Sequence, residues 1–258
     1  MEILKSESLT LAYEGINVIE NLNFSVDYGD YLCIIGENGS GKSSLLKAII
    51  GDVQPAAGKL TLDPTARKKG IGYLPQQNII QSDFPATSYE VVISGCIGRN
   101  KLGLFWNKEA KNKADEAMEL LGISSLSDKP ISVLSGGQRQ KVLLARAFCA
   151  SSDILLLDEP VNGLDPSAAH EMYSSIRMLN QSRNMTIIMV SHDVQCALHE
   201  ANKILSLCRG HSFFGTPDEY YIHEQKDAEY DHKLHDCTHC HVHHLQKSTE
   251  GGTHNATV

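Results

Sequence analysis

The fold of this chain is decided by one stretch of sequence, Gly36-Glu37-Asn38-Gly39-Ser40-Gly41-Lys42-Ser43. It follows the apolar run 31–35, which predicts a strand buried on both faces, and it precedes a helical pattern of apolar residues at 45–50 that ends at Gly51. This spacing of Gly and Gly-Lys-Ser between strand and helix is the P-loop pattern, in which backbone N–H groups and a helix N-terminus surround a phosphate. The sequence therefore predicts a nucleotide-binding loop.

Individual residues of this loop have distinct expected roles. The glycines let the backbone turn its N–H groups inward, Lys42 is placed to reach the β- and γ-phosphates of ATP, and the Ser43 hydroxyl is placed to ligate Mg²⁺. The alternative is a flexible glycine-rich loop without a ligand, which the position between strand and helix disfavours. The loop residues predicted to bind ATP are Gly36, Asn38, Gly39, Ser40, Gly41, Lys42, Ser43 and Ser44.

A second apolar run, 154–157, ends in the acidic pair Asp158-Glu159 before Pro160. Because the run predicts a buried strand, both carboxylates are expected to emerge together at its end, beside the phosphate loop. There Asp158 would hold Mg²⁺, and Glu159 would polarise the water that attacks the γ-phosphate. The alternative is an acidic pair that only caps a helix.

Strand and helix patterns alternate along much of the chain, which favours an α/β fold with a mostly parallel sheet. Short alternating apolar stretches in residues 1–31 predict two or three antiparallel strands, and residues 83–150 are mainly helical. Residues 168–182 predict the crossover helix between strands at 154–157 and 186–190.

The segment Leu134-Ser135-Gly136-Gly137-Gln138 opens a further helix. Ser135 is expected to be its N-cap, and the two glycines leave backbone N–H groups exposed, so this is a second anion-binding surface. The pentapeptide resembles the signature of ABC ATPases. The resemblance covers about residues 3–216 and implies a P-loop NTPase (RecA-like) core, an antiparallel β subdomain and an α-helical subdomain that carries the signature.

In that family the signature closes over the ATP of a partner subunit. The resemblance thus implies a homodimer around two ATP molecules, with Ser135, Gly137 and Gln138 on the partner's nucleotide. Four more positions match motifs of that family. The resemblance implies that Tyr13 stacks on adenine and that Gln76 senses Mg²⁺ and the attacking water. It also implies that Asp165 joins the two active sites and that His192 contacts the γ-phosphate. The implied catalytic residues are Glu159, His192, Gln76 and Lys42, and the implied Mg²⁺ ligands are Ser43, Gln76 and Asp158.

Two departures qualify the resemblance. Gln77 follows Gln76 directly, which leaves open which glutamine serves, and Val161 stands where the family often has Thr or Phe.

Charge and hydropathy restrict the partners. A formal charge of −8 provides no basic surface for nucleic acid, and no apolar stretch reaches the ~18 residues that span a bilayer. Seven cysteines, an odd number scattered mostly singly, favour reduced thiols in a cytosolic protein. We therefore expect a peripheral protein on the cytoplasmic face of the cell membrane, bound to an integral membrane permease and indirectly served by a substrate-binding protein.

The transported substrate is predicted from a narrower resemblance. The segments Phe84-Pro85-Ala86-Thr87, Val91-Val92 and Gly95 to Arg99 look like those of the ATPases of zinc and manganese importers. This implies uptake of a divalent metal, zinc or manganese, although such segments also suit a generic helical subdomain.

The composition changes after residue 216, so we expect an ATPase domain at 1–216 and a tail at 217–258. Seven of the twelve histidines lie between residues 222 and 246, together with two cysteines. Imidazole and thiolate groups gathered in this way suit Zn²⁺, but their spacing is not that of a regular zinc finger. The alternative is a disordered end of biased composition. The predicted zinc ligands are His232, His235, Cys237, His239, Cys240, His241, His243 and His244.

Two other functions remain open from the sequence. One is a soluble ABC ATPase that is not coupled to transport, although those resemble tandem domains or domains split by coiled coils. The other is a metal-binding adaptor with a nucleotide switch, against which Glu159 and His192 argue.

Overall fold

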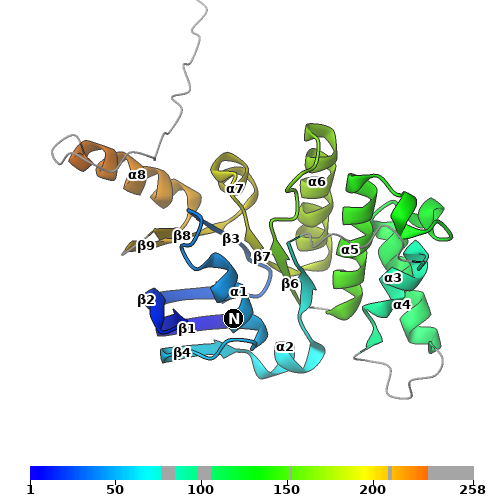
Figure 1. Ribbon diagram of the computed structural model, residues 1–258, viewed down its shortest axis with the longest axis horizontal. Helices are drawn as coiled ribbons and strands as arrows, with labels where there is room; N and C mark the ends of the chain where they lie inside the picture. Colours follow the sequence, from blue (N-terminus) through cyan, green and yellow to red (C-terminus); the bar gives the residue numbers. More distant parts are fainter. Residues whose placement is uncertain (77–84, 98–105, 152, 209–210, 232–258) are drawn as a thin grey trace, which may run out of the picture. The chain divides into compact units, whose positions relative to one another are not determined.

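The computed structural model describes residues 1–76, 85–97, 106–151, 153–208 and 211–231. The chain divides into two compact units, Met1–Tyr220 and Tyr221–Val258, and the first holds both sheets and most of the helices (Figure 1). Within the described residues, no helix is long and apolar enough to cross a membrane.

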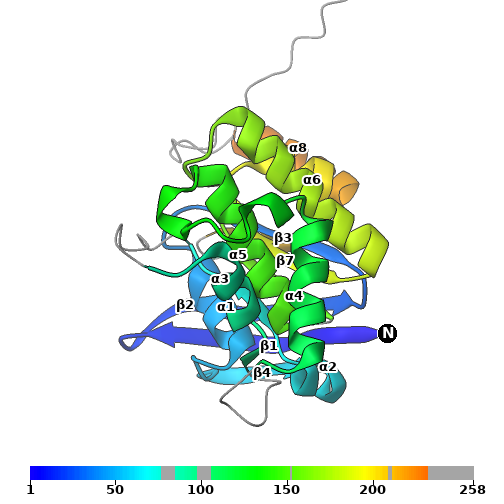
Figure 2. The same cartoon turned by 90° about the vertical axis from the view of Figure 1, so that its right-hand side faces the viewer.

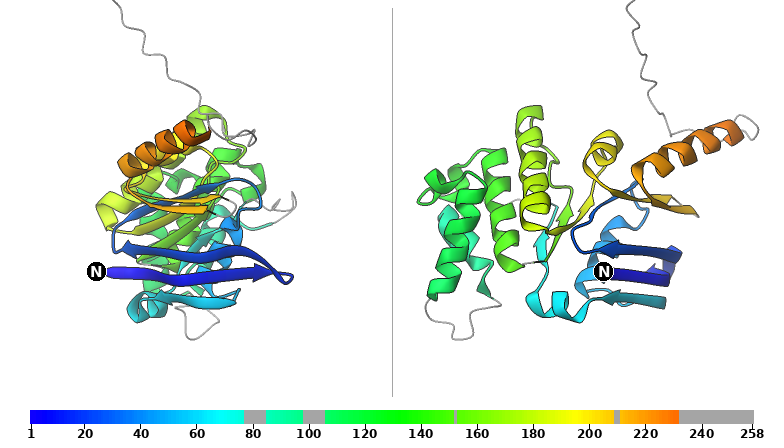
Figure 3. Two further views of the ribbon diagram at one scale, coloured as in Figure 1. Left: turned by 90° about the vertical axis from the view of Figure 1, so that its left-hand side faces the viewer. Right: turned by 180° about the vertical axis from the view of Figure 1, so that it is seen from behind.

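The first sheet is antiparallel and lies at the start of the chain. Its strands are β1 (Glu2–Tyr13), β2 (Ile16–Asp27) and β4 (Ala57–Leu62), in the order β2-β1-β4 (Figure 3). The two residues that join β1 to β2, Glu14 and Gly15, both have positive φ, +49° and +81°. A two-residue turn of this kind matches the twist of the flanking strands. The predicted antiparallel strands are confirmed.

The second sheet has six strands in the order β5-β6-β7-β3-β8-β9. Five of them run parallel and β9 runs antiparallel to β8. The strands are β3 (Tyr31–Gly36), β5 (Gly72–Leu74), β6 (Ile154–Asp158), β7 (Thr186–Val190), β8 (Lys203–Cys208) and β9 (His211–Gly215). Because the five strands are parallel, the loops that follow β3, β5, β6 and β7 leave the sheet at one edge.

Both faces of this sheet are covered, as the unbroken apolar runs predict. Alternate residues of β3 belong to different cores: Cys33 and Ile35 pack with the helical part of the chain, while Leu32 and Ile34 pack with α1 and the first sheet. The central strands are thereby held between two layers, and the loops at their carboxyl ends are fixed in position.

Helices occupy the predicted segments after the P-loop, within residues 83–150 and at the crossover (Figure 2), whereas α2, α7 and α8 lie where no helix was predicted. The helix after the P-loop ends at Gly51, and the crossover helix predicted at 168–182 is the longer α6. The bounds are α1 (Lys42–Ile50), α2 (Pro64–Lys69), α3 (Ser88–Ser94), α4 (Lys108–Leu120), α5 (Gly136–Ala150), α6 (Pro166–Arg183), α7 (Val194–Glu200) and α8 (Pro217–Asp231), with 3-10 turns at Ser124–Leu126 and Ile131–Val133. Figure 2 shows α3, α4 and α5 side by side, which forms the helical subdomain.

The first compact unit ends four residues after the expected domain boundary at 216. Tyr220 is buried, and its ring meets that of Phe213 edge-on at 5.5 Å. A C-terminal truncation that leaves the core intact should therefore keep the first turn of α8, which carries Tyr220. Among the described residues, the five cysteines form no disulfide.

Candidate nucleotide site

The P-loop follows β3 and turns into α1 through three glycines with positive φ, Gly36, Gly39 and Gly41. A Cβ at Gly36 would lie 2.2 Å from the Leu207 carbonyl oxygen, and one at Gly41 would lie 2.7 Å from a side-chain carbon of Ile19. No L side chain fits either place, so glycine is required for both conformation and space. The loop is thus a close-fitting backbone cradle, as the sequence predicts.

Lys42, in the first turn of α1, is buried within this cradle. Its ammonium group donates hydrogen bonds of 2.7 Å to the carbonyl oxygens of Gly36 and Glu37. Burial lowers its pKa, while Glu159, Asp158 and Glu37 act in the opposite direction. The charge is therefore held at the mouth of the loop, close to the acidic pair.

Asp158 is the last residue of β6 and is 6% exposed. Burial, and then the neighbouring charge of Glu159, raise its pKa. Its Oδ1 atom and the Ser40 hydroxyl are both buried and have no hydrogen-bond partner within the described part of the chain. Such orphaned oxygens are rare and costly. A carboxylate and hydroxyls beside a P-loop fit Mg²⁺, which takes oxygen ligands together with phosphate.

Glu159 contacts two other predicted residues, Gln76 and His192, and the three residues come from three different loops. Gln76, after β5, donates a 2.8 Å hydrogen bond to its Oε2 atom, and His192, after β7, contacts its Oε1 atom through Nε2. The Glu159 backbone has φ +50°, a left-handed conformation that a non-glycine residue seldom adopts. The turn after β6 therefore holds this carboxylate in place with its backbone in a strained conformation.

Asn162 is a member of this cluster that the sequence reasoning missed. Its amide group donates a 2.8 Å hydrogen bond to the same Oε2 atom of Glu159 that Gln76 contacts. The available signal was its position three residues after the glutamate, which brings the two side chains together in a tight turn.

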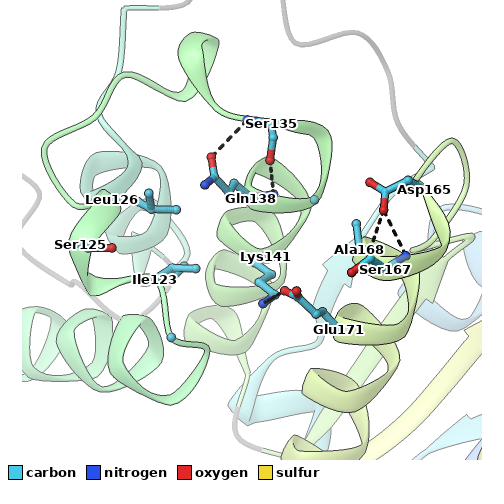
Figure 4. A pocket seen from close by; sticks show the side chains of 12 residues that line it. Ile123, Ser125, Leu126, Ser135, Gln138, Lys141, Asp165, Ser167, Ala168 and Glu171 are labelled. Carbon is cyan, nitrogen blue, oxygen red and sulfur yellow. Dashed lines mark hydrogen bonds and ion pairs between the residues drawn. The ribbon is translucent and has the colours of Figure 1, made fainter.

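The signature lies on a separate surface, at the start of α5 (Figure 4). Ser135 caps the helix: its hydroxyl accepts from the Gln138 N–H at 3.3 Å, and the Gln138 side chain accepts from the Ser135 N–H at 3.2 Å. Both residues and Gly137 line a cavity of about 370 Å³ that also includes Asp165, the N-cap of α6. The described lining of this cavity contains no residue of the P-loop.

Tyr13 is the last residue of β1 and is 60% exposed. The strand that follows the hairpin turn, β2, packs Ile19 against Gly41 at the start of α1. The hairpin that bears the tyrosine is therefore anchored on the P-loop, and the aromatic ring is free for a ligand.

The predicted zinc ligands of the tail, His232 to His244, lie outside the described residues. Within the described part, no group of three or more His, Cys, Asp or Glu side chains is arranged to hold a metal ion.

Comparison with known proteins identifies the family. The family described as ABC transporter matches residues 19–162, more than half of the chain. The chain belongs to the ABC transporter family. ATP-binding subunits of this family are ATPases that bind ATP with Mg²⁺, and the P-loop and acidic pair of this ABC transporter chain lie in the matched segment.

Three similar proteins cover most of this ABC transporter chain. It is 35% identical over 221 residues to the zinc import ATP-binding protein ZnuC of Jannaschia sp. (strain CCS1), with 84% of each chain covered. The structure of cbiO1 from Clostridium perfringens, part of the ABC transporter complex cbiONQ, is 27% identical, with a TM-score of 0.74 over 90% of this chain and 96% of that one. A dimeric ATP-binding cassette in a post-hydrolysis state with ADP and Pi is 25% identical, with a TM-score of 0.68 over 81% and 97%. The predicted P-loop NTPase fold is confirmed.

Proposed function

We propose that this chain is the ATP-hydrolysing subunit of an importer that takes up a divalent metal, zinc in preference to manganese, through a separate membrane permease. The observation that carries the proposal is its 35% identity, over most of both chains, to a zinc import ATP-binding protein. The cluster around Glu159 beside the P-loop supports the enzymatic part.

In this proposal different residues of the chain bind different parts of ATP. Tyr13 stacks on the base, and the loop 36–44, with Lys42, holds the phosphates. Mg²⁺, when bound, neutralises phosphate charge. Ser43, Gln76 and Asp158 would hold it, and the unpartnered buried oxygens of Ser40 and Asp158 support a polar ligand at this place.

Glu159 acts as the base that accepts a proton from the attacking water. Its carboxylate is bonded by Gln76, His192 and Asn162 in the described structure. These contacts occupy three of the roughly four lone-pair sites of the carboxylate, so Oε1 keeps a site that can accept a proton from water. We further assign to Gln76 and His192 a turn toward Mg²⁺ and the γ-phosphate respectively when ATP is present, which would open more of the carboxylate to water.

We further propose that two copies of the chain act together. The signature residues Ser135, Gly137 and Gln138 face away from the P-loop of their own subunit and close over the nucleotide of the second copy, with Asp165 between the two sites. The dimeric cassette among the similar structures supports this arrangement. The dimer binds the permease at the cytoplasmic face of the membrane, and a substrate-binding protein delivers the metal on the other side.

The tail is proposed to bind Zn²⁺ through its imidazole and thiolate groups, a role separate from ATP chemistry. Support comes from the sequence alone, eight such groups between residues 232 and 244.

The test is a transport assay with the membrane protein that co-purifies with this chain. The pair is reconstituted into vesicles with the cognate binding protein, and uptake of Zn²⁺ and Mn²⁺ is measured with ATP. We expect ATP-dependent Zn²⁺ uptake that exceeds Mn²⁺ uptake and is lost in Glu159→Gln. Glu20 is an exposed residue of β2, so Glu20→Gln is the matched control, and this variant should support normal uptake. ATP turnover by the reconstituted pair without uptake of either metal would favour the soluble ATPase, and absence of turnover would favour the adaptor.

A further inference from the structure

The signature helix α5 and the helix α6 touch at their N-terminal ends. A Cβ at Gly137 would lie 2.8 Å from the Cβ of Ala168, and one at Gly136 would lie 3.5 Å from Leu164. Figure 4 shows the first turns of the two helices side by side, with Ser135 on one and Asp165 on the other. Because small residues meet here, the backbones approach closely at the two helix starts, while residues further along both helices share one buried core.

A second contact lies one turn further along both helices. Lys141 of α5 forms a 2.7 Å ion pair with Glu171 of α6 (Figure 4). Lys141 is four residues beyond Gly137, and Glu171 is three beyond Ala168, so each lies on the same helix face as the first contact. The lysine side chain is only 20% exposed, and its hydrogen bond and charge lower the pKa of Glu171. The pair is therefore a formed contact that lines the cavity beside the signature.

We propose that Lys141 and Glu171 are positioning residues for the signature. Together with the close approach of Gly137 and Ala168, the ion pair holds the N-terminal part of α5 against α6, and with it the Ser135 hydroxyl and the exposed N–H groups of the first turn. The inference rests on the proposed function, because the ligand that those groups meet is the nucleotide of a second copy. Loss of the pair should leave the subunit's own ATP site intact and impair closure over the partner's ATP.

The chain offers a matched control on the same helix. Arg183, the last residue of α6, pairs with Glu116 of α4 in the helical subdomain. It lies 12 residues beyond Glu171, about 18 Å along the helix at 1.5 Å per residue. Both pairs join α6 to the helical subdomain, but only Lys141–Glu171 lies beside the signature. If the ion pairs served only to attach the subdomain, loss of either would have the same effect.

The experiment compares Lys141→Met, Glu171→Gln, the charge swap Lys141→Glu with Glu171→Lys, and the control Glu116→Gln. For each we measure kcat and KM for ATP, nucleotide affinity of the monomer, and ATP-dependent dimerisation in the Glu159→Gln background. The single variants should lose about fivefold or more in kcat and need more ATP to dimerise, with monomer affinity within about twofold. The swap should recover most of the loss, and Glu116→Gln should stay within about twofold. Normal turnover in the single variants, or an equal loss in Glu116→Gln, overturns the proposal.

A second measurement separates this inference from the proposed function. If the Glu159→Gln protein does not dimerise with ATP, the dimer part of the proposed function fails. Hydrogen exchange of the backbone amides of residues 137–141 in the monomer then decides the inference by itself. Faster exchange in Lys141→Met than in Glu116→Gln supports the positioning role, and equal exchange in the two contradicts it.

Discussion

At the scale of single residues, the proposed ATP chemistry depends on two adjacent carboxylates that lie in different surroundings. Asp158 is buried with an unpartnered oxygen, while Glu159 is bonded by Gln76, Asn162 and His192. A buried carboxylate with one unpartnered oxygen suits a cation, whereas a carboxylate held by side chains with one acceptor site left open suits a base. The two neighbours therefore support different roles, and each can be tested by an amide substitution that keeps the shape.

Glu159→Gln should slow ATP hydrolysis by roughly 10²-fold or more while ATP still binds, because the amide cannot accept a proton from water. The nucleotide-bound dimer should then persist. Steady-state turnover, nucleotide binding and size-exclusion chromatography with and without ATP provide the three measurements. A variant with normal turnover would remove Glu159 from its assigned role.

Asp158→Asn should stabilise the nucleotide-free protein at neutral pH. The pKa of Asp158 is raised by burial and by Glu159, so the charged form opposes folding above that pKa, and the amide removes this penalty. We expect Tm at pH 7 to rise above that of the unmodified protein. The gain should shrink as pH falls toward the raised pKa, since the wild type is then protonated as well. Thermal melts across pH provide the test, with Asp218→Asn on exposed α8 as control. A gain that grows on acidification contradicts the assignment.

At the scale of elements, two helix N-termini present backbone N–H groups for anions on different surfaces. α1 begins at Lys42 inside the P-loop, and α5 begins at Gly136 behind its Ser135 cap. A single subunit needs only one such surface for the γ-phosphate of its own ATP, so the second is available to a partner.

Substitutions at the two helix starts should therefore separate binding from turnover. Lys42→Ala should weaken nucleotide binding by the monomer about 10-fold or more, because a charge-assisted hydrogen bond to phosphate is lost. Ser135→Arg should leave monomer binding nearly unchanged and block both dimer closure and hydrolysis. Fluorescent-nucleotide titration of each monomer, followed by turnover assays, distinguishes them. Equal loss of monomer binding in both would mean that the signature does not act across an interface.

At the scale of the whole molecule, every residue assigned to ATP lies before the tail. Truncation should be made after Asp231, since Tyr220 in α8 is buried against Phe213. The shortened protein should keep its ATPase rate and lose most of its Zn²⁺ binding. In the full chain that binding should weaken below about pH 6, where protons compete for imidazole and thiolate. Calorimetry of both proteins with Zn²⁺ settles the binding, and equal affinity and stoichiometry would leave the histidines without a role.

The sequence by itself determined the local elements of this protein. The strand 31–35, the glycine turns of the P-loop and the N-cap Ser135 each depend on residues only a few positions apart, so spacing and residue type suffice to predict them. Burial of the strand at 154–157 likewise predicts that Asp158 and Glu159 emerge at its end. The resemblance to ABC ATPases added Gln76 and His192 without indicating how they meet.

Only the tertiary structure decided which side chains touch. Gln76 reaches Glu159 across 83 residues because β5 pairs with β6, and His192 reaches it because β7 lies on the other side of β6. The Lys141–Glu171 pair exists because α5 crosses α6 at Gly137 and Ala168. The physical reason is that contacts between distant segments depend on strand order and helix packing, which many chain sections determine jointly and no local pattern records.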